Sequence, residues 1–185
     1  MTEIARKIRV AGTGGARLRS SRTTLTALSV IFLASGFWIL IAGFSFVDSY
    51  ALMIGALTGT AVLLFTLIFF VSPMLNDNVL TPTKLTVRYG VLFKLDIPIG
   101  HIKKVEPVAT GAMGFLPFSR GLRLGIEYSL IDHRYSVLRS KRGMVKVVLN
   151  KELTVDGWFS QRRLDEIVFD TLDPMAFIER MTGSA

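Results

Sequence analysis

The stretch KLTVRYGVLFKLDIPIG, Lys84 to Gly100, decides the fold of the second half of this 185-residue chain. Apolar residues occupy every second position on both sides of Gly90: Leu85, Val87, Tyr89, Val91, Phe93, Leu95, Ile97 and Ile99. Such alternation indicates strands with one buried face, and a glycine between two of them favours a turn. The stretch therefore predicts a β-hairpin that turns at Gly90.

The residues that follow predict more strands and then one helix. Further strands are expected at about 102–108, 122–128, 135–139, 144–149 and 166–169. In DPMAFIERMTG, Asp173 is a suitable N-cap, Pro174 suits the first helical position, and Gly183 follows as a stop. The apolar residues of this segment are spaced for one helix face. We expect a strongly bent antiparallel sheet whose open end the C-terminal helix covers.

The residues that precede the hairpin are of a different kind. From Thr23 to Met74 the only charged residue is Asp48, and the mean hydropathy of the whole chain is +0.47. A helix needs about 20 apolar residues to cross a bilayer. The sequence predicts two transmembrane helices, at about 25–46 and 50–72, that Pro73 ends. Three parts result: a basic cytoplasmic tail (1–22), a helical hairpin (23–73) and a cytoplasmic domain (78–185).

The charges predict an orientation in the cell membrane. The tail carries six basic residues and one glutamate, and the turn between the helices carries only Asp48. Because basic flanks stay in the cytoplasm, both termini are expected inside, as in a two-span protein. A cleaved signal peptide is the alternative, since LASG at 33–36 resembles a cleavage site. The apolar run continues beyond it through FWILIAGF, which favours a span.

The second apolar run contains GALTG, with Gly55 and Gly59 four residues apart. This spacing lets another helix backbone approach closely. We expect the two helices of the hairpin to pack on each other there, and dimerisation is the alternative. The middle of either helix has no ionisable residue, which argues against a transport path.

The order of these parts resembles the bacterial and archaeal pleckstrin-homology-like domain proteins with membrane anchors. The matching positions are Thr83, Leu85, Gly90, Ile97, Pro98, Ile102, Val105, Asp173, Pro174 and Phe177. The resemblance implies an α+β membrane protein: a transmembrane hairpin followed by a pleckstrin-homology-like bent antiparallel β-barrel that a C-terminal helix caps. It implies no catalysis and no set of functional residues. Residues 110–121 and 153–163 depart from the family pattern as insertions.

The residue types argue against an enzyme and against a metal or cofactor site. The chain has no cysteine and two histidines, His101 and His133, which are interpreted as surface or turn residues. No paired-carboxylate, G-x-S-x-G or H-x-x-x-H pattern is present. Asp165, Glu166 and Asp170 lack the spacing of a calcium loop. We expect no catalytic residue, no cofactor and no metal.

Two apolar segments with arginines are the candidate interaction surface. They contribute Phe115, Leu116, Phe118, Arg120, Arg123, Trp158, Phe159, Arg162 and Arg163. The first lies in GAMGFLPFSRG, residues 111–121, where glycine and proline indicate a loop. Its phenylalanines are expected to contact the domain core, a partner protein or lipid, and these alternatives stay open. A further basic set, Lys103, Lys104, Arg139, Lys141 and Arg142, is interpreted as a solvated turn.

These observations favour a membrane-anchored, non-catalytic binding or scaffold protein. Its domain is expected to bind an unknown protein or a second copy of itself. Recognition of anionic lipid at the membrane surface is the alternative, and an accessory subunit of a membrane enzyme or transporter is a less favoured one. The basic residues do not interleave with aromatics on one strand face, so no nucleic acid is expected as a partner.

Overall fold

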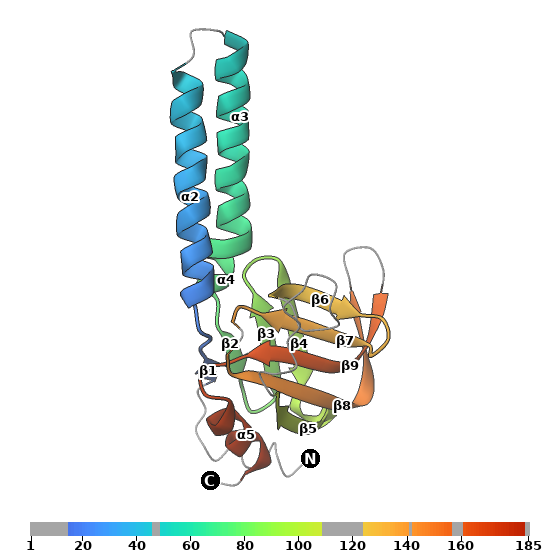
Figure 1. Ribbon diagram of the computed structural model, residues 1–185. Coiled ribbons are helices and arrows are strands. Elements are labelled where there is room, and N and C mark those ends of the chain that lie inside the picture. The colour runs from blue at the N-terminus through green and yellow to red at the C-terminus, as the bar shows by residue number, and fades with distance from the viewer. Residues whose placement is uncertain (1–14, 46–48, 109–123, 141, 157–160, 184–185) are drawn as a thin grey trace.

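The computed structural model describes residues 15–45, 49–108, 124–140, 142–156 and 161–183. Within them the chain is an α+β protein in which a pair of long helices projects from a domain of two β-sheets (Figure 1). This agrees with the expected order of helical hairpin, strands and C-terminal helix. The bent antiparallel β-barrel that the family resemblance implied is not found among the described residues, whose strands form two separate sheets.

Two helices in the structure are long and apolar enough to cross a membrane. The first is α2 (Thr23–Phe44), and the second runs through α3 (Ser49–Thr66), the π-helical turn η1 (Leu67–Val71) and α4 (Ser72–Leu75). The sequence predicted that Pro73 ends the second helix. The structure instead places Pro73 at the start of α4, and the helix continues to Leu75. The wider π-helical turn before Pro73 changes the hydrogen-bond register, since the Ser72 N–H donates to the Leu67 carbonyl. The proline ring is accommodated without a break.

The two helices pack on each other through glycines. A Cβ atom on Gly55 would lie 2.5 Å from the Gly43 Cα atom, and one on Gly59 would lie 2.5 Å from the Leu40 Cγ atom. Both glycines of GALTG therefore face the other helix of the same hairpin. This is the packing that the sequence favoured over dimerisation. Nearer the domain, Phe32 stacks on Phe70 with ring centroids 5.1 Å apart.

The first sheet has the order β1-β2-β3-β4, and all of its pairs are antiparallel. Its strands are β1 (Ala16–Leu18), β2 (Asn78–Leu80), β3 (Lys84–Tyr89) and β4 (Phe93–Pro98). The β3–β4 pair is the hairpin predicted from the sequence, with Leu85 opposite Ile97 and Val87 opposite Leu95.

The helical hairpin is inserted between two neighbouring strands of this sheet. Ala16, before α2, pairs with Leu80, after α4. The sequence analysis assigned residues 1–22 to a tail and began the domain at 78, because a three-residue strand carries no pattern of its own. The structure places Ala16–Leu18 in the sheet, so a fragment that begins at residue 78 lacks one of its strands.

The second sheet has the order β5-β8-β9-β7-β6. A short 3-10 helix, η2 (Ile99–His101), leads from β4 into this sheet. Its strands are β5 (Ile102–Pro107), β6 (Gly125–Ser129), β7 (Arg134–Leu138), β8 (Met144–Asp156) and β9 (Gln161–Asp170). The β7–β9 pair is parallel, which departs from the expected all-antiparallel arrangement. The chain leaves β7, crosses β9 and forms β8 on its other side.

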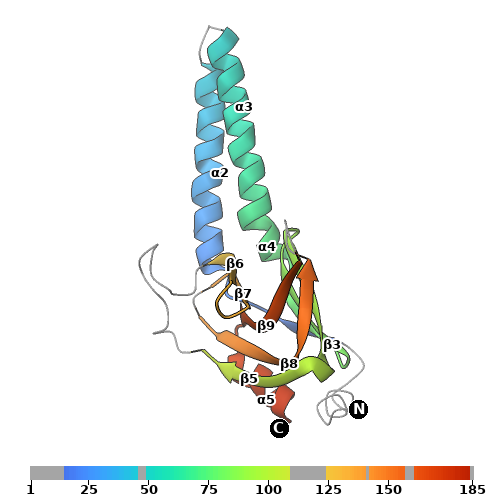
Figure 2. The ribbon, with the colours of Figure 1, turned by 90° about the vertical axis from the view of Figure 1, so that its right-hand side faces the viewer.

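Within the segment 153–163, which departs from the family pattern, the structure describes residues 153–156 and 161–163. These described residues lie in the outer half of a long β8–β9 pair, in which Leu153 pairs with Leu164 and Asp156 with Gln161. A shift of register between Val148 and Leu153 separates this half from the inner one. In Figures 1 and 2 the far end of the hairpin points to the same side of the domain as α2 and α3.

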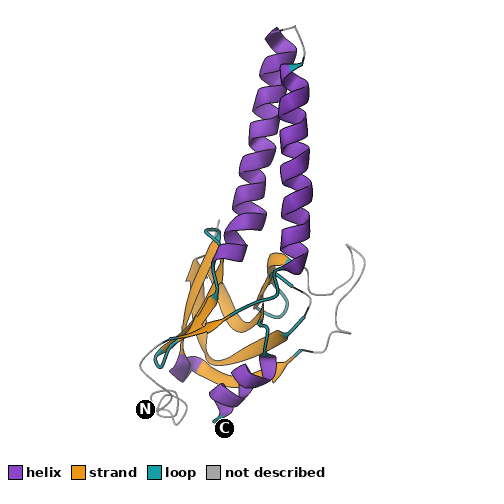
Figure 3. Cartoon of the chain, turned by 90° about the vertical axis from the view of Figure 1, so that its left-hand side faces the viewer, coloured by secondary structure: helices purple, strands orange, loops and turns teal. Residues whose placement is uncertain are grey.

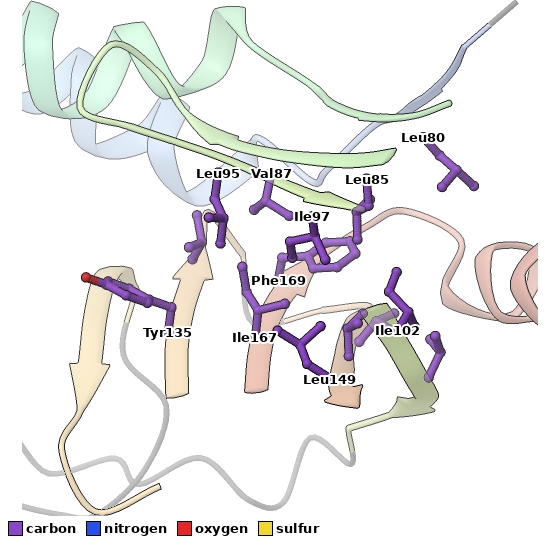
Figure 4. Close-up of a cluster of buried hydrophobic side chains, with 14 of the residues drawn as sticks. Leu80, Leu85, Val87, Leu95, Ile97, Ile102, Tyr135, Leu149, Ile167 and Phe169 are labelled. Carbon is purple, nitrogen blue, oxygen red and sulfur yellow. The ribbon is translucent and has the colours of Figure 1, made fainter. Parts of the chain in front are cut away.

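The core lies between the two sheets. Leu85, Val87 and Ile97 of the first sheet face Ile167 and Phe169 of the second (Figure 4). The C-terminal helix α5 (Pro174–Thr182) forms as predicted, and the Asp173 side chain accepts a hydrogen bond from the Ala176 N–H. The helix buries Phe177 and Met181. It covers the end of the domain opposite α2 and α3 (Figures 1 and 3).

Candidate functional site

A buried polar cluster joins the helical hairpin to both sheets, and we call it the junction. Its centre is Arg139, which follows β7 and is 0% exposed. The Arg139 Nε–H donates to the Pro73 carbonyl over 3.0 Å, and Nη1 donates to the Ser20 Oγ over 3.3 Å. Nη2 donates to the carbonyl of Arg88 in β3. One side chain thus holds the segments at both ends of the hairpin and the first sheet.

Asp170, at the end of β9, supplies the negative charge of the junction. Its Oδ1 accepts a hydrogen bond of 3.0 Å from the Arg139 backbone N–H. Its carbonyl accepts one from the Asn78 side chain over 3.4 Å, while the Asn78 Oδ1 accepts from the Arg88 N–H over 2.9 Å. Among the described residues Oδ2 has no partner. Asn78 is also buried, so the junction extends from β9 across β2 to β3.

Burial sets the ionisation of the junction. It raises the pKa of Asp170 to about 6, although the backbone N–H and the guanidinium of Arg139 act in the opposite direction. Burial also lowers the pKa of Arg139 and raises that of Tyr89. Burial thus outweighs the attraction of the guanidinium, so the Asp170 carboxyl is protonated more easily in the folded chain than in the unfolded one.

Further contacts around the junction connect the helical hairpin to the domain. The Arg22 guanidinium forms an ion pair of 2.8 Å with Asp77, which links the start of α2 to the segment after α4. The Leu172 N–H donates to the Arg19 carbonyl over 2.6 Å. The hairpin is therefore fixed to the domain on several sides and is not joined to it by a free linker.

We predict that Asp170 makes stability depend on pH in a definite direction. Its pKa rises from 3.8 in the unfolded chain to about 6 in the folded one, so the folded state binds this proton more tightly. Its contribution to stability is therefore greatest near pH 4 and falls as the pH rises to about 6, by about 3 kcal/mol at most. Asp170→Asn should remove this part of the pH dependence, measured as the midpoint of thermal unfolding at pH 5 and pH 7.

Asp96→Asn is the matched control for this experiment. The Lys84 ammonium and the Thr86 hydroxyl hold the pKa of Asp96 below its ordinary value, so its contribution is lost only below pH 4. The unfolding midpoint of Asp96→Asn should then change between pH 5 and pH 7 by as much as that of the wild type. An Asp170→Asn protein whose midpoint changes by the same amount would contradict the assignment.

A second feature is the turn between β6 and β7. Polar contacts stabilise this turn, and two of its apolar side chains are exposed. The Ser129 hydroxyl donates to Asp132 over 3.2 Å, and the Arg134 guanidinium lies 3.4 Å from the same carboxylate. His133 has a positive φ of 45°, and its carbonyl accepts from the Asp165 N–H over 2.9 Å. Leu130 and Ile131 remain outside, 75% and 85% exposed.

Most of the predicted interaction surface falls outside the described residues. This is so for Phe115, Leu116, Phe118, Arg120, Arg123, Trp158 and Phe159. Arg162 and Arg163 lie at the outer end of β9. The Arg162 guanidinium lies 4.6 Å from the centre of the Tyr128 ring, while Arg163 is paired with Glu152 at 2.8 Å and Asp165 at 3.0 Å. Arg163 is thus less available to a phosphate than the sequence suggested.

The junction was missed by the sequence analysis, which placed Arg139 in a solvated turn. That interpretation is wrong, because Arg139 is buried. A signal was present, since Tyr135, Val137 and Arg139 have the same parity along one strand and the first two face the core. Its partner Asp170 comes from a distant strand, which no local pattern indicates.

A groove lies beside the β8 register shift. It has a volume of about 440 Å³ and is lined by Asp132, Val148, Leu149, Asn150, Lys151, Glu152, Arg163, Asp165 and Glu166. Arginines pair with three of its carboxylates, and Lys146 lies 3.7 Å from Glu166. Within the described part of the chain no group of histidine and acidic residues is arranged to hold a metal ion.

Comparisons of the chain with models of protein families, with curated proteins and with solved structures found no match. The resemblance to bacterial pleckstrin-homology-like proteins stays a prediction.

Proposed function

We propose that the chain is a two-span membrane protein with both termini in the cytoplasm, and that its domain acts by binding and not by catalysis. The apolar surface of the helices supports the first part. Trp38, Phe44 and Leu57 are among many large side chains that the rest of the chain leaves exposed. A soluble protein rarely exposes so large an apolar area, whereas lipid would cover it.

The observation that carries the binding role is the β6–β7 turn. Leu130 and Ile131 are exposed on a short turn, which is stabilised by the hydrogen bonds that Asp132 and the His133 carbonyl accept. A rigid apolar pair loses little conformational entropy on binding, which favours its use as an anchor in a protein interface. The turn lies at the side of the domain away from α2 and α3 (Figure 1). In this proposal the domain is a scaffold that contacts another protein or a second copy of the chain.

Photocrosslinking in native membranes tests this role. The photoreactive residue p-benzoylphenylalanine replaces Ile131 in one variant of the full chain and Met175 in the other. Both side chains are exposed, but Met175 lies on α5 at the opposite end of the domain. We expect a discrete protein adduct from position 131 that position 175 does not give, and that Leu130→Ser weakens.

The same variants separate the alternatives. An adduct that forms with the purified, reconstituted chain alone would show self-assembly, while one that forms only in native membranes would show another protein. Absence of any protein adduct specific to position 131 would contradict the scaffold role. A lipid adduct there would favour recognition of the membrane surface, the second candidate, which the position of the β3–β4 turn supports.

A further inference from the structure

We propose that the β3–β4 turn, Gly90–Leu92, is a lipid-contacting site that inserts Val91 into the phospholipid interface beside the second span. This inference rests on the proposed membrane insertion and adds a third point at which the protein meets the bilayer. The turn lies next to α4 in Figures 1 and 3. Its depth, its exposed side chain and its basic flanks carry the argument.

Contacts with Ser72 fix the depth of the turn. The Val91 N–H donates to the Ser72 Oγ over 2.9 Å. Gly90 has a φ of 60°, and a Cβ atom there would overlap Ser72 Oγ and lie 2.7 Å from the Pro73 nitrogen. The turn backbone and the end of the helix are thus in direct contact. Whatever depth Ser72 has in the membrane, Val91 must share it.

The sequence around Ser72 places that depth at the interface. No charged residue lies between Asp48 and Ser72, and the first one after Ser72 is Asp77. An apolar helix of this length passes from hydrocarbon to headgroups where its uncharged run ends. Ser72 therefore lies close to the level of the lipid headgroups, and the β3–β4 turn lies there with it.

Val91 is turned outward at this level. Its side chain is 77% exposed, whereas the neighbouring Leu92 packs against the core cluster. Turns usually carry glycine or polar residues, and a branched apolar side chain at the tip gains nothing from water. Leu75, one turn after Ser72, is exposed as well. Both side chains would be covered if lipid surrounded this part of the molecule.

Two basic residues flank the tip. Arg88 and Lys94 lie directly opposite each other in the β3–β4 register, where like charges repel. Lys94 reaches Asp96 only at 3.9 Å, and within the described residues no ion pair is formed by Arg88. Cations close to a membrane surface are attracted to anionic headgroups, which would relieve this repulsion. Lipid is therefore a better occupant of the site than an apolar protein surface.

Single-cysteine labelling of the full chain tests the site, because the natural sequence contains no cysteine. We would make Val91→Cys, Leu64→Cys in α3 and Met175→Cys in α5, and attach an NBD fluorophore to each in vesicles of phosphatidylcholine with phosphatidylglycerol. Nitroxide-bearing lipids then report the contact. Val91→Cys should be quenched severalfold more than Met175→Cys, with a blue-shifted emission, and most strongly by a nitroxide at headgroup depth.

The three positions separate failure of this site from failure of membrane insertion. If Leu64→Cys is quenched by nitroxides in the acyl chains while Val91→Cys behaves like Met175→Cys, the lipid-contacting site is refuted and the membrane anchor stands. If Leu64→Cys is also unquenched and water-accessible, both proposals fail. Equal midpoints of thermal unfolding for the three unlabelled variants show that each retains the fold.

Discussion

Replacing Arg139 by methionine should destabilise the chain about as strongly as truncating a large core side chain. The change removes the buried guanidinium whose charge favours the Asp170 carboxylate, and it removes three hydrogen bonds to Pro73, Ser20 and Arg88. Loss of one partner from a buried charged pair costs about 3–5 kcal/mol. For a chain of this size that corresponds to a fall of about 10 °C in the unfolding midpoint. Circular dichroism of the detergent-solubilised chain measures it.

Two controls make this result specific to the buried charge. Lys103→Met removes an exposed cation from β5 and should leave the midpoint nearly unchanged. Adding Asp170→Asn to Arg139→Met should recover part of the loss, because no unpaired charge then remains. An Arg139→Met protein as stable as Lys103→Met would show that the junction does not hold the hairpin to the domain.

The second large effect is expected from Gly143→Ala, at the turn before β8. Gly143 has a φ of 67°, and its carbonyl accepts a hydrogen bond of 2.8 Å from the Thr171 N–H. A Cβ atom there would overlap the Thr171 carbonyl oxygen. This oxygen belongs to the backbone, so it cannot move aside by a side-chain rotation. Left-handed strain and overpacking together should cost about 2–5 kcal/mol.

Two other glycines separate the strain from the overlap. Gly125 has a φ of 109° but open space around its Cβ position, so Gly125→Ala reports strain alone. Gly100 has neither a positive φ nor a neighbour within 4 Å, so Gly100→Ala should have the smallest effect. The midpoint of thermal unfolding should be highest for Gly100→Ala, lower for Gly125→Ala and lowest for Gly143→Ala. Equal midpoints for the last two would show that Thr171 moves away at no cost.

The sequence predicted the elements whose pattern is local. The alternation in 84–100 produced β3 and β4, and the uncharged runs produced α2 and the longer second helix. Asp173, Pro174 and Gly183 bounded α5 as predicted, because capping depends only on neighbouring residues. The packing of the two helices at GALTG was predicted from the spacing of its glycines, which is also a local pattern.

The sequence did not predict features that depend on distant partners. The parallel β7–β9 pair depends on where the chain crosses after Arg139, and the alternation of a strand does not reveal its neighbour. The pairing of β1 with β2 spans the whole helical hairpin. Arg139 was misplaced because the acceptors of its buried guanidinium, in Ser20, Pro73 and Arg88, all lie far from it in the sequence. Its charge alone indicated the surface.

The insertion of the hairpin between β1 and β2 has a consequence for the order of events during synthesis. A ribosome releases β1 first, then both helices, and only afterwards the strand with which β1 pairs. If the helices enter a membrane as proposed, β1 waits in the cytoplasm while they are inserted. Their antiparallel return then brings Asn78 back to Leu18. Membrane insertion would thus bring β1 and β2 together. A failed insertion would leave these two strands unpaired and expose the domain to proteolysis.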